Sequence, residues 1–321
     1  MCGIVGFFDR AGSGRAVGRT VLDMLTALAC RGPDSAGVAV WSEAAGGLIA
    51  RVKTGERAVS DAVKRGVAAA ARRFGRVHAL TTQGPMIRLV IAKAEVAEFA
   101  AALEAVAPDV EVVSMGHRLE IVKQVGAPAN LEAEFRVSRL AGTHALGHTR
   151  LSTESRVDLS HSQPFWAHGT PDLAVVHNGH ITNYHRLRRL YEQEGVRFYT
   201  ENDSEVIGIY LARKLREGLT LRQALEASVR DLDGSFSYLA ATASTFGYAK
   251  DPYCLKPLIV VESGQVVAIA NEEIALHAVL GAGYRAREAG AGEVGTWEIR
   301  PSRGGARARR RGARTHLRQV A

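Results

Sequence analysis

The chain has 321 residues, of which 46% are hydrophobic and 23% charged, a composition typical of a globular protein with one large domain. No run of about 18 apolar residues is present, so we expect no transmembrane helix, and the first residues lack the basic region of a signal peptide. These features favour a cytoplasmic protein without a membrane partner. The three cysteines, Cys2, Cys30 and Cys254, are too scattered for disulfides or a metal site, and we expect the last two to be buried.

The positive charge is concentrated at one end of the chain. Residues 301–321 contain seven arginines and no acidic residue, so they account for seven of the eight net positive charges. Such a basic tail is expected to be disordered or to act as a docking segment. No aromatic platform or recognition motif accompanies it, so nucleic acid is not an expected partner.

The first fifty residues predict strands around one helix. An apolar strand is expected at 1–8 and a helix at 16–29, where apolar side chains recur along one side. A turn rich in helix breakers follows at 31–37. Further strands are expected at 38–41 and 48–52.

The pattern then changes over residues 54–141, which we interpret as an α+β insertion within a domain spanning 2–300. Alanine-rich helices alternate there with short strands, and no chemical motif is present. The expected helices are 57–73 and 94–107, and the expected strands are 87–91, 110–113 and 119–122.

Strands and helices continue to about residue 300, and together they predict two sheets with helices outside. The expected strands are 145–149, 173–176, 235–241, 246–250, 258–261 and 266–270. The expected helices are 184–194, 204–216, 221–231 and 272–280.

Cys2 stands out because an initiator methionine is normally removed when a small residue follows it. The mature chain would then begin with a residue that carries both a thiol and a free α-amine. An α-amine has a pKa of about 7.7–8.0 and accepts a proton near neutral pH far better than a lysine does. A terminal Cys2 would therefore supply a nucleophile and a base together.

Five short motifs occur along the chain. They are MCGIVG at 1–6, RGPDSAG at 31–37, GHTRLST at 147–153, HNGHITN at 177–183 and ENDSEVI at 201–207. Together and in this order they closely resemble the class-II glutamine amidotransferases, which belong to the N-terminal-nucleophile hydrolases. The resemblance covers residues 2–53 and 142–300, and it implies an α+β fold, a four-layer αββα sandwich, here with the insertion.

The resemblance implies roles that suit the chemistry of amide hydrolysis. Attack by a thiolate on a carboxamide creates an oxyanion, which Asn178 and the backbone N–H of Gly179 would stabilise. The zwitterionic end of glutamine needs a guanidinium and a carboxylate, and Arg150 and Asp203 match those positions.

A second group of residues is expected to support the site. Arg31, Asp34 and Ser35 lie in one motif, and His148 precedes Arg150. We expect His148 to be structural, and likewise His177, because a terminal amine makes a histidine base unnecessary. Leu151 stands where hexosamine-forming members have tryptophan, and compact members lack the insertion, so the resemblance leaves the acceptor of ammonia open.

The sequence contains neither the ATP-pyrophosphatase loop of asparagine synthetases nor a sugar-phosphate domain. It is similar to the free-standing amidotransferase subunits of split glutamate synthases and N-methylglutamate synthase. We therefore expect a glutaminase subunit that hydrolyses L-glutamine through a Cys2 thioester and passes ammonia to a synthase subunit. FMN and iron–sulfur clusters would belong to that partner, with no cofactor on this chain.

Two alternatives belong to other functional classes. The chain could be an amidohydrolase for another amide, but the pairing of Arg150 with Asp203 suits an amino-acid zwitterion. It could also be a non-catalytic regulatory relative, but the presence of Cys2, Asn178 and Gly179 argues against that.

Overall fold

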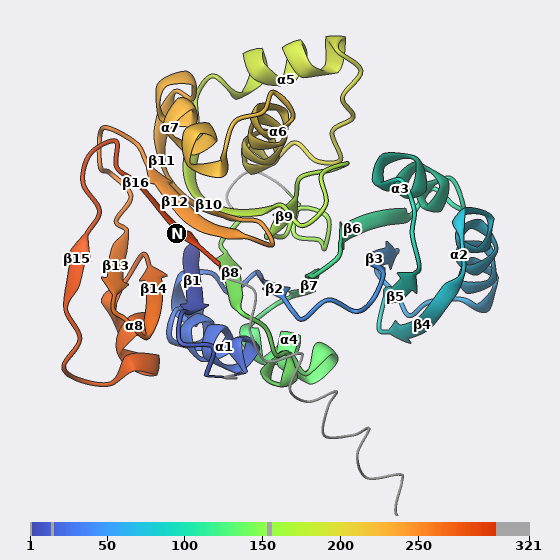
Figure 1. Cartoon of the computed structure of the whole chain (residues 1–321), viewed down its shortest axis with the longest axis horizontal. Helices are drawn as coiled ribbons and strands as arrows, with labels where there is room; N and C mark the ends of the chain where they lie inside the picture. Colours follow the sequence, from blue (N-terminus) through green and yellow to red (C-terminus); the bar gives the residue numbers. More distant parts are fainter. Residues whose placement is uncertain (1, 14–15, 153–155, 300–321) are drawn as a thin grey trace, which may run out of the picture.

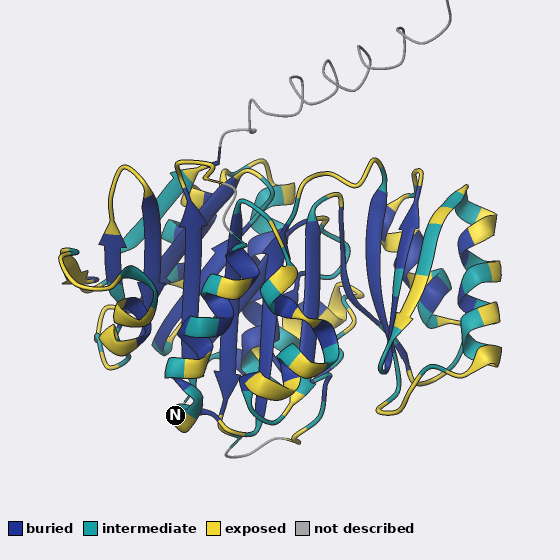
Figure 2. Ribbon diagram, turned by 90° about the horizontal axis from the view of Figure 1, so that it is seen from below, coloured by how far each residue is buried: buried dark blue, intermediate teal, exposed yellow. Residues whose placement is uncertain are grey.

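The computed structural model describes residues 2–13, 16–152 and 156–299, and its strands form three antiparallel sheets (Figure 1). The basic segment 301–321 lies outside the described residues. Two of the sheets face each other and form the body of the molecule, and the third forms a smaller unit beside them (Figure 2).

The first body sheet has seven strands, with β1 at its centre. All seven residues of β1 are buried, which explains why this strand is apolar up to its last residue, Asp9. It pairs with β14 on one side and β8 on the other. The order across the sheet is β15 (Ala286–Glu288), β13 (Ile259–Glu262), β14 (Val266–Ala270), β1 (Gly3–Asp9), β8 (His144–Arg150), β2 (Ser35–Trp41) and β7 (Leu119–Val125).

The second body sheet has five strands, and its long central pair carries the second half of the site. In that pair, β10 runs antiparallel to β11 over eight residues. The order is β16 (Val294–Glu298), β12 (Thr245–Lys250), β11 (Gly234–Ala241), β10 (Ala174–Ile181) and β9 (Phe165–Trp166).

Helices cover the outer face of each body sheet, so the body has four layers. The helix α1 shows why, since Val17, Val21 and Leu25 recur at helical spacing and are fully buried against β1 and β8. The seven-stranded sheet is covered by α1 (Val17–Ala27), α4 (Pro128–Phe135) and α8 (Glu273–Leu280), and the five-stranded sheet by α5 (Tyr184–Gln193), α6 (Asp203–Arg216) and α7 (Leu221–Asp231). Short 3₁₀ turns occur at η1 (Ala29–Arg31) and η2 (Val137–Arg139).

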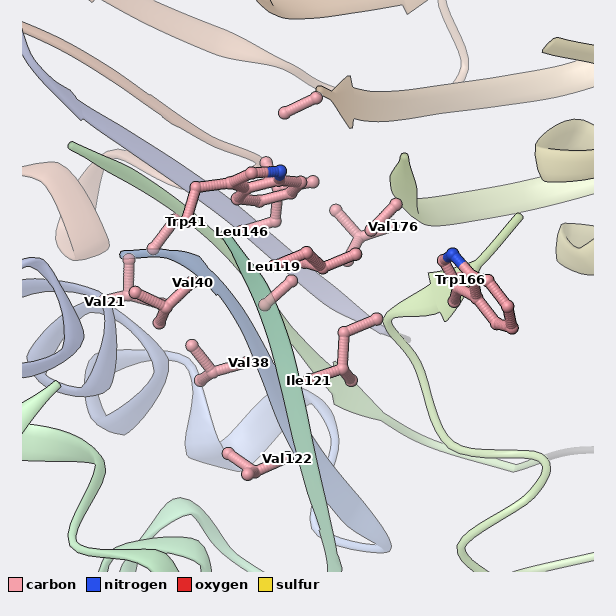
Figure 3. Packing of buried hydrophobic residues seen from close by; sticks show 14 of the residues in the cluster. Val21, Val38, Val40, Trp41, Leu119, Ile121, Val122, Leu146, Trp166 and Val176 are labelled. Carbon is pink, nitrogen blue, oxygen red and sulfur yellow. The ribbon is translucent and has the colours of Figure 1, made fainter. Parts of the chain in front are cut away.

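The core lies between the two body sheets and against α1. Figure 3 shows Trp41, Leu146 and Val176 packed within this cluster. Trp41 is fully buried, and its indole N–H donates to the carbonyl of Asp172 at 2.8 Å, which satisfies its one polar group. Gly6 permits the close approach of the sheets, because a Cβ atom there would lie 2.7 Å from the ring of Phe246.

The third sheet and its helices form what we call the four-stranded subdomain, residues 48–116. The strand order is β4 (Val77–Gln83), β5 (Met86–Ile91), β3 (Leu48–Thr54) and β6 (Val110–Gly116), with α2 (Asp61–Phe74) and α3 (Val96–Glu104) outside.

These bounds differ from the insertion expected at 54–141. The separate sheet already includes Leu48, and β7 is an edge strand of the seven-stranded sheet, where it pairs with β2 along its whole length. The helix α4 packs against β7 and β2. Local periodicity identifies strands but not their partners, so residues 119–141 were wrongly grouped with the insertion.

Candidate active site

A cavity of about 470 Å³ opens where β1 begins and where β8 and β10 end. All five residues expected to act in catalysis or substrate binding line it. They come from four motifs that lie far apart in the sequence, and the fold brings them to one end of the two facing sheets. They are Cys2, Arg150, Asn178, Gly179 and Asp203.

Cys2 precedes β1 directly and is held by its backbone. Its carbonyl oxygen accepts hydrogen bonds from Arg31 Nε at 3.2 Å and from Asn271 Nδ2 at 3.2 Å. Asn271 also accepts the backbone N–H of Ile4 at 3.0 Å. The thiol Sγ lies 3.8 Å from the carbonyl oxygen of Leu151 at the wall of the cavity. The backbone of Cys2 is therefore oriented while its side chain stays accessible.

Two of the expected supporting residues join the chain around Cys2 to the neighbouring segments. Arg31, at the end of η1, pairs with Glu272. The carboxylate of Asp34 accepts the N–H of Ser152 at 2.7 Å, and its own N–H donates to the carbonyl of Arg150 at 3.0 Å. Asp34 therefore links the 31–37 turn to the end of β8.

Ser35 and His148 lie behind the cavity rather than in it. Ser35 is buried opposite Arg150 in the β2–β8 register. His148 is fully buried, with Nε2 3.2 Å from the carbonyl oxygen of His177, and burial lowers the pKa of His148 to about 3. A neutral, enclosed imidazole fits the structural role that we expected for it.

Arg150 ends β8 and is buried at the wall of the cavity. The residue is 4% exposed, and Nη1 donates to the carbonyl of Arg156 at 2.8 Å. Burial lowers the pKa of Arg150, while the nearby charges of Cys2, Asp158 and Asp34 act in the opposite direction. A guanidinium nevertheless stays protonated in proteins, so the cavity has a fixed cation at this wall.

Asn178 and Gly179 occupy neighbouring positions near the end of β10. The amide nitrogen Nδ2 of Asn178 is buried and has no hydrogen-bond partner among the described residues. Gly179 has φ +141°, and a Cβ there would lie 2.1 Å from the carbonyl oxygen of Ser235, so only glycine fits. The arrangement leaves an unpaired donor beside the thiol-bearing cavity, where an incoming acceptor could use it.

Asp203 is the first residue of α6, whose preceding residue Asn202 caps the helix by accepting the N–H of Ser204 at 3.0 Å. One carboxylate oxygen of Asp203 accepts the N–H of Ile181 at 2.8 Å. The helix dipole also favours an acidic residue at this position. His177 lies behind it, with Nδ1 3.7 Å from the carboxylate of Asp203, and burial lowers the pKa of His177.

The structure adds two residues that the sequence did not suggest. One is Asn271, which follows β14 and fixes the carbonyl of Cys2. The other is Gln163, whose side chain accepts the N–H of His177 at 2.7 Å and donates to Ser204 Oγ at 3.0 Å. Neither lies in a recognised motif, and only strand pairing and loop packing bring them to the site.

The expectation for the other two cysteines was wrong. Cys30 is exposed and Cys254 is half-buried, because η1 and the turn after β12 both lie at the surface. Within the described residues, no group of three or more His, Cys, Asp or Glu side chains is arranged to hold a metal ion. No helix in the same residues is long and apolar enough to cross a membrane.

Comparison with known proteins identifies the family. A family model described as "Glutamine amidotransferase domain" matches residues 148–278. The chain is 37% identical over 278 residues to the "Glutamine amidotransferase-like protein GlxB" of Rhizobium meliloti, with 86% of this chain and 91% of that protein covered. The chain belongs to the class-II glutamine amidotransferases. It is also 36% identical over 311 residues to a "Putative glutamine amidotransferase" of Methanothermobacter thermautotrophicus, covering 93% and 100% of the two chains.

Solved structures confirm the expected fold of this glutamine amidotransferase. The "allosteric regulatory enzyme of purine biosynthesis" matches with a TM-score of 0.61 at 21% identity, covering 93% of this chain and 49% of that one. The "glutamine phosphoribosylpyrophosphate (PRPP) amidotransferase from B. subtilis" matches with a TM-score of 0.59 at 22% identity and the same coverage. The chain thus spans about half the length of these enzymes, and the shared part has the fold of an N-terminal-nucleophile hydrolase sandwich.

Proposed function

We propose that this protein is a glutaminase subunit that hydrolyses L-glutamine through a Cys2 thioester and delivers the ammonia to a synthase subunit. The observation that carries the proposal is the meeting of Cys2, the unpaired amide of Asn178, Arg150 and Asp203 around one cavity. These groups provide a nucleophile, an oxyanion donor and both charges needed to bind an amino acid.

The reaction begins at a Cys2 that has lost Met1. Its α-amine takes the thiol proton, and the thiolate attacks the carboxamide carbon of glutamine. The resulting oxyanion accepts hydrogen bonds from Asn178 Nδ2 and the N–H of Gly179. The C–N bond then breaks, the proton passes to the leaving nitrogen, and ammonia departs. Water attacks the thioester and releases glutamate and the thiol.

Substrate recognition uses the two charged residues of the cavity. We assign the α-carboxylate of glutamine to Arg150 and its α-ammonium to Asp203. Arg150 is a buried cation at the end of β8, and Asp203 is the first residue of α6. A charge-assisted hydrogen bond at each end of the zwitterion would favour a free amino acid over a peptide amide.

The acceptor of ammonia is proposed from the resemblance to the amidotransferase subunits of split glutamate synthases and N-methylglutamate synthase. FMN and iron–sulfur clusters would be held by the partner, because three dispersed cysteines in this chain cannot supply the four thiolates of a cluster. The cavity described above would then only release ammonia, and the reductive chemistry would take place on the partner.

The nucleophile can be tested by labelling and intact-mass measurement. The glutamine analogue 6-diazo-5-oxo-norleucine should alkylate Cys2 alone, and Cys2→Ala should abolish glutaminase activity with the fold retained. Cys30 is the control because its thiol is exposed and therefore open to the reagent. If Cys2 is the nucleophile, Cys30→Ala should leave both activity and labelling unchanged. Retention of Met1 in the active protein, or labelling at Cys30, would refute the proposed mechanism.

The proposed coupling to a synthase subunit is tested separately, by measuring the glutaminase turnover of this protein. Alone, the subunit should hydrolyse glutamine slowly, and the synthase subunits should activate it. The full chain and a chain ending at residue 300 should be compared, so that a response lost only on truncation identifies 301–321 as the docking segment. Turnover of roughly 10 s⁻¹ or more by the isolated protein, with no effect of added subunits, would contradict the coupled-subunit proposal.

A further inference from the structure

The four-stranded subdomain contacts two chain segments that contribute to the lining of the cavity. The first segment, 156–163, lies between β8 and β9, and the second, 197–203, follows α5 and ends on the first residue of α6. These segments include Gln163, Glu201 and Asp203, which line the cavity. The subdomain itself contributes no residue to that lining, so any effect on glutamine must pass through the two segments.

The first contact joins the edge of the subdomain to segment 156–163. The hydroxyl of Ser160 accepts a hydrogen bond from Lys53 Nζ at 2.7 Å and donates to the carboxylate of Glu111 at 2.5 Å. Lys53 belongs to β3 and Glu111 to β6, and their side chains are largely buried. Charged partners on both sides make this a strong anchor for a neutral hydroxyl.

The second contact joins α3 to segment 197–203. The phenol of Tyr199 donates to the carboxylate of Glu104 at 2.8 Å. The Tyr199 ring stacks on His168 with 3.9 Å between the ring centroids. Glu104 is the last residue of α3, and its side chain is 6% exposed. Tyr199 is therefore fixed at its hydroxyl by the subdomain and at its ring by the body.

Both segments also make hydrogen bonds to the elements that carry the substrate-binding side chains. In the second segment, the backbone N–H groups of Tyr199 and Thr200 donate to the carboxylate of Glu205 at 2.9 Å each. Glu205 belongs to the first turn of α6, which also carries Asp203. In the first segment, the carbonyl of Arg156 accepts a hydrogen bond from Arg150.

The two segments are also joined to each other. The imidazole of His161 lies 2.8 Å from the carboxylate of Asp158 within its own segment and 3.1 Å from that of Glu201 in the other. Displacement of either segment would therefore disturb both ends of the proposed glutamine site.

We propose that the four-stranded subdomain positions the glutamine-binding residues, and that Tyr199 and Ser160 are the positioning residues through which it acts. This inference rests on the proposed function, because it assigns glutamine to Arg150 and Asp203. Loss of either contact weakens glutamine binding and leaves the nucleophile in place, since Cys2 is held by Arg31 and Asn271.

Tyr199→Phe removes one hydroxyl and keeps the ring on His168. The KM for glutamine should rise about tenfold, the change expected from loss of a hydrogen bond to a charged group, while kcat stays within about twofold. Tyr210→Phe is the matched control, because the Tyr210 hydroxyl also donates to a carboxylate, that of Asp231 at 2.6 Å, on the other side of α6 and away from the cavity. Its KM should equal that of the wild type.

Ser160 provides an independent pair of variants. Ser160→Ala should raise KM in the same way, and Ser160→Thr, which keeps the hydroxyl, should restore it. Alkylation of Cys2 by iodoacetamide needs no amino-acid recognition and should be unchanged in each variant, whereas labelling by 6-diazo-5-oxo-norleucine should slow in Tyr199→Phe and Ser160→Ala.

The outcomes separate this inference from the function on which it rests. If the wild type is neither a glutaminase nor labelled at Cys2, both are overturned. If the wild type is active but Tyr199→Phe behaves like Tyr210→Phe, or iodoacetamide labelling slows in parallel with KM, the positioning role is wrong and the glutaminase function stands.

Discussion

Replacing Asn178 by alanine should affect activity and stability in opposite directions. Its amide nitrogen is buried without a partner among the described residues, and a buried donor left unsatisfied costs about 1–3 kcal/mol of folding free energy. This donor is available to an acceptor in the cavity, and the acceptor that we propose is the oxyanion formed from glutamine. Asn178→Ala should therefore lower kcat by about 10²–10³, the usual effect of losing one oxyanion donor.

The same change should leave the melting temperature equal to or above that of the wild type, because it removes the unsatisfied donor. Glutamate release gives kcat, and thermal unfolding gives the melting temperature. Ser235→Ala is the matched control, because Ser235 Oγ is another buried polar atom without a partner in the described residues but lies outside the cavity lining. A decrease in kcat of less than about tenfold, or a clear loss of stability alongside the loss of activity, would refute this reasoning.

Two further predictions concern Gly179 and His161. Gly179→Ala should abolish turnover and lower the free energy of unfolding by about 1–3 kcal/mol, because a Cβ there would lie 2.1 Å from a carbonyl oxygen; full activity in this variant would show that β10 can shift freely. For His161, the hydrogen bond with Asp158 raises the pKa of the imidazole in the folded protein. The protonated imidazole therefore stabilises the fold fully below the pKa of an unfolded histidine, about 6.5, and this stabilisation is lost as the pH rises through the folded pKa. Urea unfolding between about pH 6 and pH 8 should therefore show a fall in stability that His161→Gln lacks, and equal slopes in the two proteins would contradict it.

The sequence by itself predicted the type of fold and a set of residues that the structure brings together. Cys2, Arg150, Asn178, Gly179 and Asp203 belong to the short motifs that carry the family resemblance, and all line one cavity. Such motifs are visible in the sequence because each expected role demands a particular residue type. A terminal thiol, an Asn-Gly pair and an acidic residue that begins a helix can all be recognised without knowledge of their neighbours.

Only the tertiary structure decided which segments support those residues. Asn271 holds the carbonyl of Cys2 although 269 residues separate them, and nothing in its surroundings in the sequence indicates this. The residues of β7 were assigned to the insertion, yet they pair with β2 in the body. The contacts of Glu104 with Tyr199 and of Glu111 with Ser160 were likewise missed. In each case the interaction depends on strand pairing or loop packing between distant segments, and hydrophobic periodicity carries no information about which segments will meet.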